Sequence, residues 1–280
     1  MKLFENKIML GAWVSADIEI TESELVCLDH NGNVIWQTRP PFAVYNMEFF
    51  NEKIMIPVGI TKQTKNPTLD NLPQQYMTFD YNGNYLGIRD FNSNVKLFDN
   101  TYLSFDYHNK NGIIITEYNA NGEYNFSVTL NNNSVYKIEK TFAGDYIFAT
   151  HPNNDIFDVS IYIITKNGFI KEVEELKEYK KYIKSKTFFP SITAICKNRE
   201  GDIYLFINSQ EITGISMTDQ HFFIKLDSQY NILGIWKIQY DIEPSYYNKF
   251  YVDKENILTV ISTNKEMAEE IKVFRIREQP

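Results

Sequence analysis

The sequence predicts an all-β protein, a six-bladed β-propeller made of four-stranded antiparallel blades. Three observations support this prediction. A short strand–turn–strand unit recurs six times along the 280 residues, a second such unit follows nearly every copy, and the composition favours strands. Hydrophobic residues make up 43% of the chain and aromatic residues 15%, enough to fill a large core between sheets. A β-sandwich is the alternative, but its strands need no regular four-strand period.

The first hairpin of each unit consists of an apolar strand, a turn with Asn, Asp or Gly, and a second apolar strand. Its copies read KLFENKIML (2–10), EFFNEKIMI (48–56), KLFDNTYLS (96–104), KTFAGDYIF (140–148), AICKNREGDIYLF (194–206) and KFYVDKENILTV (249–260). Successive copies lie about 50 residues apart, the length of four short strands with their connections. They divide a single predicted domain, 1–280, into blades at 1–46, 47–94, 95–138, 139–190, 191–246 and 247–280.

The second hairpin of each unit is marked by a repeated turn. LDHNGNVIW (28–36) and FDYNGNYLG (79–87) share Asp-x-Asn-Gly-Asn between apolar strands. Asn-Gly tolerates positive φ at both central positions of a type I′ turn, so we expect a tight hairpin. The equivalent positions in the first five units are Gly32, Gly83, Gly122, Gly168 and Asn231. A calcium loop is excluded because, counted from Asp29, Pro40 stands where a bidentate Glu is required.

Two segments depart from the regular repeat. The sixth unit ends after IKVFRI (271–276), so the last blade is predicted to be three-stranded or to be completed by a terminal segment. KEVEELKEYKKYIKSK (171–186) lengthens the fourth unit, and its apolar residues at helical spacing predict a short amphipathic helix. The lysines of this segment suit either a solvated surface or a contact with an anionic partner or a membrane.

The repeats resemble those of the broad superfamily of six-bladed propellers. PSITAICKNREGDIYLF (190–206) is similar to the opening of an NHL-type repeat. LDHNGNVIW (28–36) resembles the outer hairpins of PQQ-like and arylsulfotransferase-like propellers. The resemblance covers nearly the whole chain and implies the fold. It implies no activity, because the shared residues build blades and propellers serve many unrelated functions.

Charge and composition argue against several classes of function. The formal net charge of −8 argues against binding to a nucleic-acid backbone, which needs a concentrated basic face. No apolar run reaches the roughly 18 residues of a transmembrane segment. The two cysteines, Cys27 and Cys196, lie in apolar runs and are predicted to be buried free thiols.

The first residues allow two interpretations. MKLFENKIMLGAWVSA (1–16) has the lysine, the apolar run and the small residues of a weak secretory signal. However, Glu5 precedes the apolar run, and the same residues form the first copy of the repeat. We therefore expect a cytoplasmic protein, with a secreted or periplasmic one as the alternative if a signal is present.

The predicted topology puts tight turns and long connections on opposite faces of the blades. In a four-stranded meander, the first-to-second and third-to-fourth connections lie at one end and the others lie at the opposite end. The first set is short here. The second set is 15–24, 61–75, 106–112, 151–158, 208–220 and 262–270, with 37–46, 88–95 and 241–248 between blades. Because long loops on a rigid scaffold often carry function, we predict a site on this long-loop face.

Titratable side chains in or beside these connections are the candidate catalytic residues. They are His108, His151 and His221, with the carboxylates Asp106, Asp155, Asp158 and Asp219 nearby in the sequence. Histidine with a carboxylate partner suits acid–base chemistry or metal binding. These are weak candidates, since no HxH or HExxH spacing supports a metal site. His30 lies in a tight turn on the opposite face.

Arginines and tyrosines are the predicted contact residues of the long-loop face. Arg39 and Arg89 lie in connections between blades, and guanidinium groups are enriched at binding hot spots. The tyrosines are Tyr45, Tyr107, Tyr246 and Tyr247. Their rings would supply apolar contact area with a hydroxyl for specificity, or would instead pack in the core at the inner strand ends.

The sequence therefore predicts a non-enzymatic binding or scaffold propeller that recognises a protein, a peptide or a glycan through its long-loop face. The alternative is a hydrolase, lyase or transferase that uses the loop histidines and carboxylates around the central channel. We expect no cofactor, no metal and no nucleic-acid partner, because the chain has no glycine-rich phosphate loop, no GxSxG motif and no clustered Cys/His site. The sequence indicates no oligomeric state.

Overall fold

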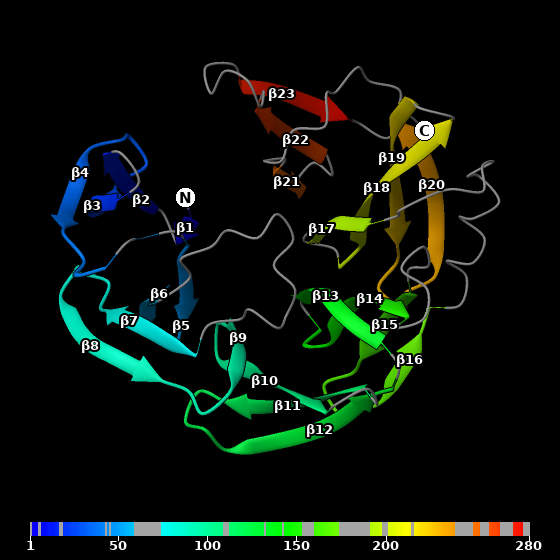
Figure 1. Cartoon of the computed structure of the whole chain (residues 1–280), viewed down its shortest axis with the longest axis horizontal. Helices are drawn as coiled ribbons and strands as arrows, with labels where there is room; N and C mark the ends of the chain where they lie inside the picture. The colour runs from blue at the N-terminus through cyan, green and yellow to red at the C-terminus, as the bar shows by residue number, and fades with distance from the viewer. Residues whose placement is uncertain are drawn as a thin grey trace. The chain divides into compact units, whose positions relative to one another are not determined.

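The computed structural model shows strands throughout the part of the chain that it describes (Figure 1). The described residues are 2–4, 7–16, 19–42, 44, 46–58, 74–108, 112–131, 133–141, 143–152, 160–173, 191–197, 201–213, 216–238, 249–252, 258–263 and 271–276. Within these ranges, no helix is long and apolar enough to cross a membrane. The strands form five four-stranded sheets and one three-stranded sheet, numbered 1 to 6 in chain order.

Contacts divide the chain into two compact units, Met1–Leu130 and Asn131–Pro280. The first unit holds sheets 1 to 3. Sheet 1 contains β1 (Lys2–Phe4), β2 (Lys7–Ala16), β3 (Glu19–Leu28) and β4 (Val34–Thr38). Sheet 2 contains β5 (Glu48–Phe50), β6 (Lys53–Pro57), β7 (Gln75–Phe79) and β8 (Tyr85–Asp90). Sheet 3 contains β9 (Asn94–Phe98), β10 (Thr101–His108), β11 (Gly112–Asn119) and β12 (Tyr124–Leu130).

The second unit holds sheets 4 to 6. Sheet 4 contains β13 (Asn133–Lys140), β14 (Tyr146–Pro152), β15 (Ser160–Ile164) and β16 (Ile170–Glu172). Sheet 5 contains β17 (Ser191–Lys197), β18 (Ile203–Thr213), β19 (Ser216–Leu226) and β20 (Ile232–Ile238). Sheet 6 contains β21 (Lys249–Val252), β22 (Leu258–Thr263) and β23 (Ile271–Ile276). All neighbouring strands are antiparallel and follow the chain order.

Two segments of the second unit differ from the sequence prediction. β13 begins at Asn133 and therefore runs across the expected boundary between 138 and 139. Residues 170–172 pair with β15 as strand β16, so the helix expected over 171–186 does not begin at 171. The rest of that segment, beyond Val173, lies outside the described residues. The single domain over 1–280 stays a prediction.

Successive sheets of the first unit pack face to face. The core between sheets 1 and 2 contains Met9, Leu25, Cys27, Ile54, Ile56, Met77 and Phe79, together with Val44 and Met47 from the connection. The core between sheets 2 and 3 contains Phe50, Met55, Tyr76, Phe91, Val95 and Leu97. Side chains alternate between the two faces of a strand, so Ile54 and Ile56 enter the first core while Met55 enters the second. Sheet 2 is thus apolar on both faces.

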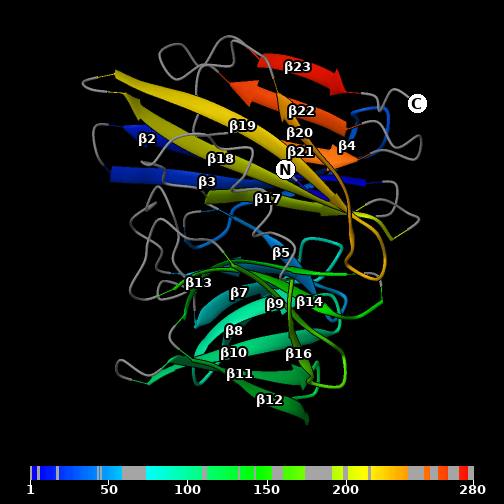
Figure 2. The same ribbon diagram turned by 90° about the vertical axis from the view of Figure 1, so that its right-hand side faces the viewer.

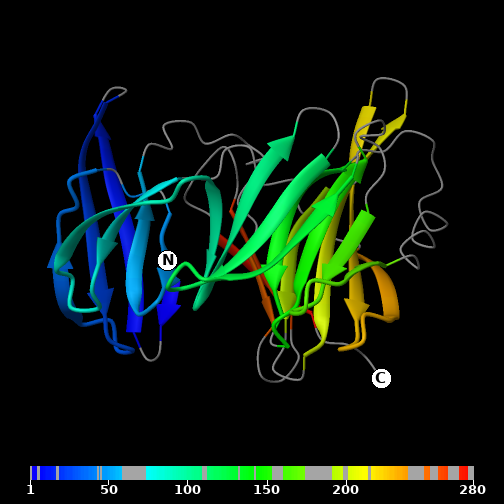
Figure 3. The same ribbon diagram turned by 90° about the horizontal axis from the view of Figure 1, so that it is seen from below.

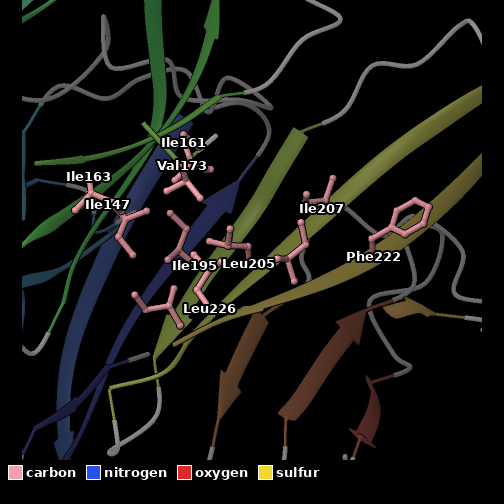
Figure 4. Packing of buried hydrophobic residues seen from close by; sticks show 12 residues of the cluster. Ile147, Ile161, Ile163, Val173, Ile195, Leu205, Ile207, Phe222 and Leu226 are labelled. Atoms are coloured by element: carbon pink, nitrogen blue, oxygen red, sulfur yellow. The ribbon is translucent and has the colours of Figure 1, made fainter. Parts of the chain in front are cut away.

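The same packing joins sheets 4 and 5 in the second unit (Figure 4). Sheet 4 contributes Ile147, Ala149, Ile161, Ile163 and Val173, and sheet 5 contributes Ile195, Ile203, Leu205, Ile207, Phe222, Ile224 and Leu226. Each such fully buried aliphatic side chain stabilises the fold by about 1.5–3 kcal/mol. The first strands also lie side by side, because β5 contacts β9 in the first unit, and β17 contacts both β13 and β21 in the second.

The turns between third and fourth strands are each organised by one side chain. Asp29 Oδ1 accepts hydrogen bonds from the backbone N–H groups of Asn31 and Asn33, both at 2.8 Å. The Asp29 carbonyl accepts the N–H of Gly32 at 3.1 Å, and Gly32 has a φ of +86°. This geometry is a type I turn followed by a left-handed residue and a bulge. The predicted turn is confirmed, but its type I′ assignment is wrong, because Asn31 does not have positive φ.

The same turn recurs in sheets 2, 3 and 5. Asp80, Asn119 and Asp227 take the place of Asp29, each accepting two backbone N–H groups through one side-chain oxygen. The left-handed position is Gly83, Gly122 and Tyr230 in turn, with φ of +84°, +87° and +69°. The expected assignment of this position to Asn231 is therefore wrong by one residue. In sheet 4, Thr165 Oγ1 accepts the Phe169 N–H in the same way.

A two-residue turn with positive φ at both positions occurs elsewhere. Phe50 pairs with Lys53, which leaves Asn51 and Glu52 as the loop between β5 and β6. Their φ angles are +49° and +58°, as a type I′ turn requires. In the three-residue loop the leading Asp29 accepts the N–H groups two and four residues later, whereas the two-residue loop follows Phe50, which has no side-chain acceptor. The leading Asp therefore explains why the Asn-Gly turns adopt the longer form.

Candidate functional site

The long-loop face is built in part from strands rather than loops. Residues 15–24 were expected to form a long connection, but β2 extends to Ala16 and β3 begins at Glu19. Residues 208–220 were also expected to be a connection, yet β18 extends to Thr213 and β19 begins at Ser216. Likewise, 106–108 belong to β10. These predictions are wrong because polar residues predominate in both segments, and a strand that pairs outside the core does not need an apolar face.

Two hairpins therefore extend beyond the sheets that carry them, and we call them the β2–β3 arm and the β18–β19 arm. In sheet 1, β1 pairs with β2 only as far as Met9, and β4 pairs with β3 only from Leu25. The pairing of β2 with β3 continues to Ala16 and Glu19 (Figure 3, blue). In sheet 5, the β18–β19 pairing continues past Asn208 and His221 to Thr213 and Ser216 (Figure 2).

The three candidate histidines all lie on strands. His108 ends β10 and pairs with Gly112, His151 pairs with Ser134 near the end of β14, and His221 pairs with Asn208 and Ile238 in β19. Their side chains lie outside the described residues. His108 belongs to the first unit, and the other two belong to different sheets of the second unit. Their catalytic role stays a prediction.

The candidate carboxylates are placed only in part. Asp106 is exposed on β10 opposite Ile114, and Asp219 lies opposite Gln210 in the β18–β19 arm. Asp155 and Asp158 lie outside the described residues. In the part of the chain that the structure describes, no three His, Cys, Asp or Glu side chains come together as metal ligands would.

Arg39 and Arg89 have different surroundings, although the sequence predicted the same role for both. The Arg39 side chain is 67% exposed after β4, and its Nε lies 3.6 Å from Glu24 Oε1 of β3. Arg89 lies in strand β8, not in the connection expected at 88–95. Its guanidinium carbon lies 5.0 Å from the Phe50 ring centre and 4.8 Å from that of Phe91.

Arg89 thus packs against an aromatic cluster between sheets 2 and 3. Its Nη2 donates a hydrogen bond to the Ala120 carbonyl at 3.4 Å, and burial lowers the pKa of its side chain. Tyr102 meets Phe91 edge-to-face at 5.1 Å and stacks on Tyr118 at 5.1 Å. These contacts assign Arg89 to packing between sheets. Its role as a ligand contact stays an untested prediction that these contacts do not support.

The predicted tyrosines contribute little to the described site. Tyr107 lies in β10 opposite Ile113, with its side chain outside the described part. Tyr45, Tyr246 and Tyr247 lie outside the described residues altogether. Their contact role therefore stays a prediction, as does the alternative of core packing.

The cysteines are free thiols, as predicted. Cys27 is buried, and burial raises the pKa of its thiol. Cys196 is half-buried rather than buried, and desolvation followed by the charge of Glu139 raises its pKa to about 12. A nucleophilic cysteine needs a lowered pKa, so neither thiol has the properties of a catalytic one.

Sequence reasoning missed the polar bonds between neighbouring sheets. Trp36 Nε1 of β4 donates a hydrogen bond to the Tyr81 carbonyl at 2.9 Å, in the turn between β7 and β8 of sheet 2. Lys96 Nζ of β9 lies 2.5 Å from Glu48 Oε1 of β5. No described group forms a hydrogen bond with the buried Glu48 Oε2. The alignment of the repeats carries a signal for this pair, because Glu48 stands where Lys2 and Lys96 stand in the adjacent copies.

Comparison with known proteins supports the fold and no particular activity. No protein-family model matches the chain, and no curated protein matches it. A DUF4221 family member from Bacteroides vulgatus is similar with a TM-score of 0.51 and 11% identity, covering 90% of this chain and 84% of that one. A Bacteroides caccae protein of unknown function is similar with a TM-score of 0.44 and 13% identity, covering 88% of this chain and 81% of that one. The Dos1 propeller is similar with a TM-score of 0.44 and 13% identity, covering 92% of this chain and 63% of that one.

Proposed function

We propose that the chain is a six-bladed β-propeller and a non-enzymatic binding or scaffold protein. Repeated antiparallel meanders that pack face to face, with their first strands side by side within each unit, support this architecture. The proposed ligand is a protein, a peptide or a glycan, and the proposed contact surface is the long-loop face.

The observation that carries this proposal is the difference between the two ends of the sheets. At one end, the described turns between third and fourth strands are tight, and their backbone N–H groups bond to the turn's own carbonyl and side-chain oxygens. At the other end, the β2–β3 and β18–β19 arms extend past their sheets. A two-stranded ribbon is marginal in water unless something packs on it, so the arms are suited to contact a ligand.

Arg39 is the best-placed of the predicted contact residues. It is exposed and lies against Glu24, on the strand that leads into the β2–β3 arm. An exposed pair at 3.6 Å contributes little to stability, and a guanidinium can also pair with a carboxylate or a sugar hydroxyl of a ligand.

The test is to screen the purified full chain against an immobilised glycan array and a displayed random-peptide library. The informative variant replaces 14–22 by Asn-Gly, which closes the β2–β3 arm at the Trp13–Ser23 pair. We expect this variant to keep its melting temperature and to lose the selected ligand. The matched control is Gly32→Ala in the turn between β3 and β4. This variant should be less stable and should still bind the selected ligand. The opposite pattern would overturn the proposal.

A further inference from the structure

Sheet 6 differs from the other five sheets. Sheets 1 to 5 each pair their third strand with a fourth, whereas sheet 6 has three strands in the part of the chain that the structure describes. β22 and β23 pair from Leu258–Ile276 to Thr263–Ile271, and β21, β22 and β23 follow one another across the sheet (Figure 2). Among the described strands, β23 therefore has a third-strand position with its outer edge unpaired.

An unpaired edge of this kind is a template for another strand. Alternate residues of β23 direct their backbone N–H and C=O groups away from β22, where sheets 1 to 5 have a fourth strand. In those sheets the fourth strands are five, six, seven, three and seven residues long, so an added strand of similar length would complete the repeat. Strand addition to a free edge is a common way for a sheet to bind an extended peptide.

The charge of β23 indicates which peptide would fit. Its sequence IKVFRI carries Lys272 and Arg275 and no acidic residue. The other third strands are neutral or acidic: β3 has three glutamates, β11 has Glu117, β19 has one Asp and one Lys, and β7 and β15 have no charge. β23 is thus the one positively charged third strand in a chain of net charge −8.

The same two residues disfavour pairing between two copies of this chain. An antiparallel β23–β23 contact that pairs all six residues would place Lys272 directly opposite Arg275, twice. Like charges opposite one another destabilise a strand pair, whereas opposite charges stabilise it. Basic residues on an edge are also a common protection against self-association.

We propose that the outer edge of β23 is a strand-addition site for an extended, acidic segment of a partner protein. Lys272 and Arg275 are three positions apart, so the segment would carry Asp or Glu opposite each of them, one on each face of the added strand, with apolar residues at its other positions. This site is separate from the long-loop face and does not depend on the function proposed for that face.

The test uses the full chain and two fluorescein-labelled six-residue peptides, Val-Glu-Val-Val-Glu-Val and Val-Lys-Val-Val-Lys-Val, whose second and fifth residues would face Lys272 and Arg275. Fluorescence anisotropy should show the Glu peptide binding at least about tenfold more tightly than the Lys peptide. Lys272→Glu with Arg275→Glu should reverse this preference. The matched control is Lys249→Glu in β21, at the other edge of the sheet. This variant should leave the preference for the Glu peptide unchanged.

Hydrogen exchange on the unmodified chain locates the contact, even if the double variant does not fold. Saturating Glu peptide should slow amide exchange in β23 and leave the edge strands β4 and β8 unchanged. Equal affinity for both peptides, no binding by either, protection at other edges, or a β23-mediated dimer in sedimentation would each overturn the proposal. The failure of the array screen for the long-loop face would not affect these outcomes.

Discussion

The hydroxyl of Tyr230 donates a 2.5 Å hydrogen bond to Asp145 Oδ2. This bond joins the turn between β19 and β20 of sheet 5 to the turn between β13 and β14 of sheet 4. Tyr230 adopts a φ of +69°, which is costly for a residue with a side chain. Asp145 Oδ1 also accepts the Lys166 N–H at 3.0 Å. The contact thus holds a strained residue in place by a bond between neighbouring sheets.

Removing the hydrogen bond between Tyr230 and Asp145 should destabilise the fold. We expect Tyr230→Phe to lower the free energy of unfolding by about 1–3 kcal/mol, because a half-buried bond to a carboxylate is lost while the positive φ remains. Urea unfolding of Tyr230→Phe, Asp145→Ala and the double variant would measure the coupling. Additive effects would contradict this role.

The same bond predicts a loss of stability in alkali. Burial, and then the bond to Asp145, raise the pKa of Tyr230 above its ordinary value of 10.0. A raised tyrosine pKa means that the folded state favours the protonated form. Its contribution is therefore complete below pH 10.0 and is lost as the pH rises further. Tyr230→Phe should flatten this alkaline slope in unfolding measurements.

Equivalent glycines should differ in their tolerance of alanine. A Cβ on Gly83 would lie 2.6 Å from Trp36 Cε3, whereas a Cβ on Gly32 meets nothing within 4 Å. Gly32→Ala should cost about 1 kcal/mol from its positive φ, and Gly83→Ala should cost about 3 kcal/mol because Trp36 must also move. In a Trp36→Ala background, the cost of Gly83→Ala should fall to that of Gly32→Ala. Equal costs in the parent chain would contradict the contact.

The two arginines should also separate in stability measurements. Arg89→Ala should lower the free energy of unfolding by about 1–2 kcal/mol, because it removes contacts with two aromatic rings and a bond to Ala120. Arg39→Ala, in an exposed pair, should change it by less than about 0.5 kcal/mol. Thermal melts of both variants check this difference, and an unchanged Arg89→Ala protein would refute the packing role.

The aspartate turns should weaken in acid while the threonine turn of sheet 4 does not. Hydrogen bonds from Asn84 lower the pKa of Asp80 below 3.8, so its stabilising effect is present above that pH and is lost as the pH falls through the lowered value. Asp80→Ala should therefore lose less stability at pH 2 than at pH 6. Thr165→Ala, in the matching turn of sheet 4, should lose the same amount at both, because its hydroxyl accepts a backbone N–H and does not titrate. Equal behaviour of the two variants would contradict this mechanism.

The buried pair of Glu48 and Lys96 should tolerate removal of both charges better than removal of one. Glu48→Ala should cost about 3 kcal/mol, since it leaves the lysine without its carboxylate in a largely buried site. Glu48→Leu combined with Lys96→Leu should recover most of that loss. Denaturant midpoints of the single and double variants provide the measurement, and a double variant worse than either single one would exclude this interpretation.

The sequence predicted the repeats and the positions of turns because their determinants are local. Gly83 marks a left-handed position whatever surrounds it, and Ile54 marks a strand by its apolar neighbours. What it did not predict depends on contacts between distant segments. Arg89 was expected to be a ligand contact because Phe50 and the Ala120 carbonyl are far from it in sequence, and Tyr230 was missed because its partner is Asp145.

The candidate site was less predictable than the fold. The two arms were expected to be loops, because a paired strand outside the core has no apolar alternation to reveal it. Trp36 was overlooked as a contact between sheets because its acceptor is a backbone carbonyl, which has no sequence signature. A tight turn was predictable at Asp29, but its type depended on the bonds that the side chain makes.

Several bonds between neighbouring sheets end on main-chain carbonyls. Trp36 donates to the carbonyl of Tyr81, Arg89 to that of Ala120, and Lys197 to that of Lys140. Every residue offers such a carbonyl, so these bonds would form whichever sheet came next. Copying, deleting or exchanging a whole repeat would therefore preserve them. Side-chain pairs such as Tyr230 with Asp145, and the different apolar cores between sheets, distinguish one neighbour from another and would have to adapt after such a change.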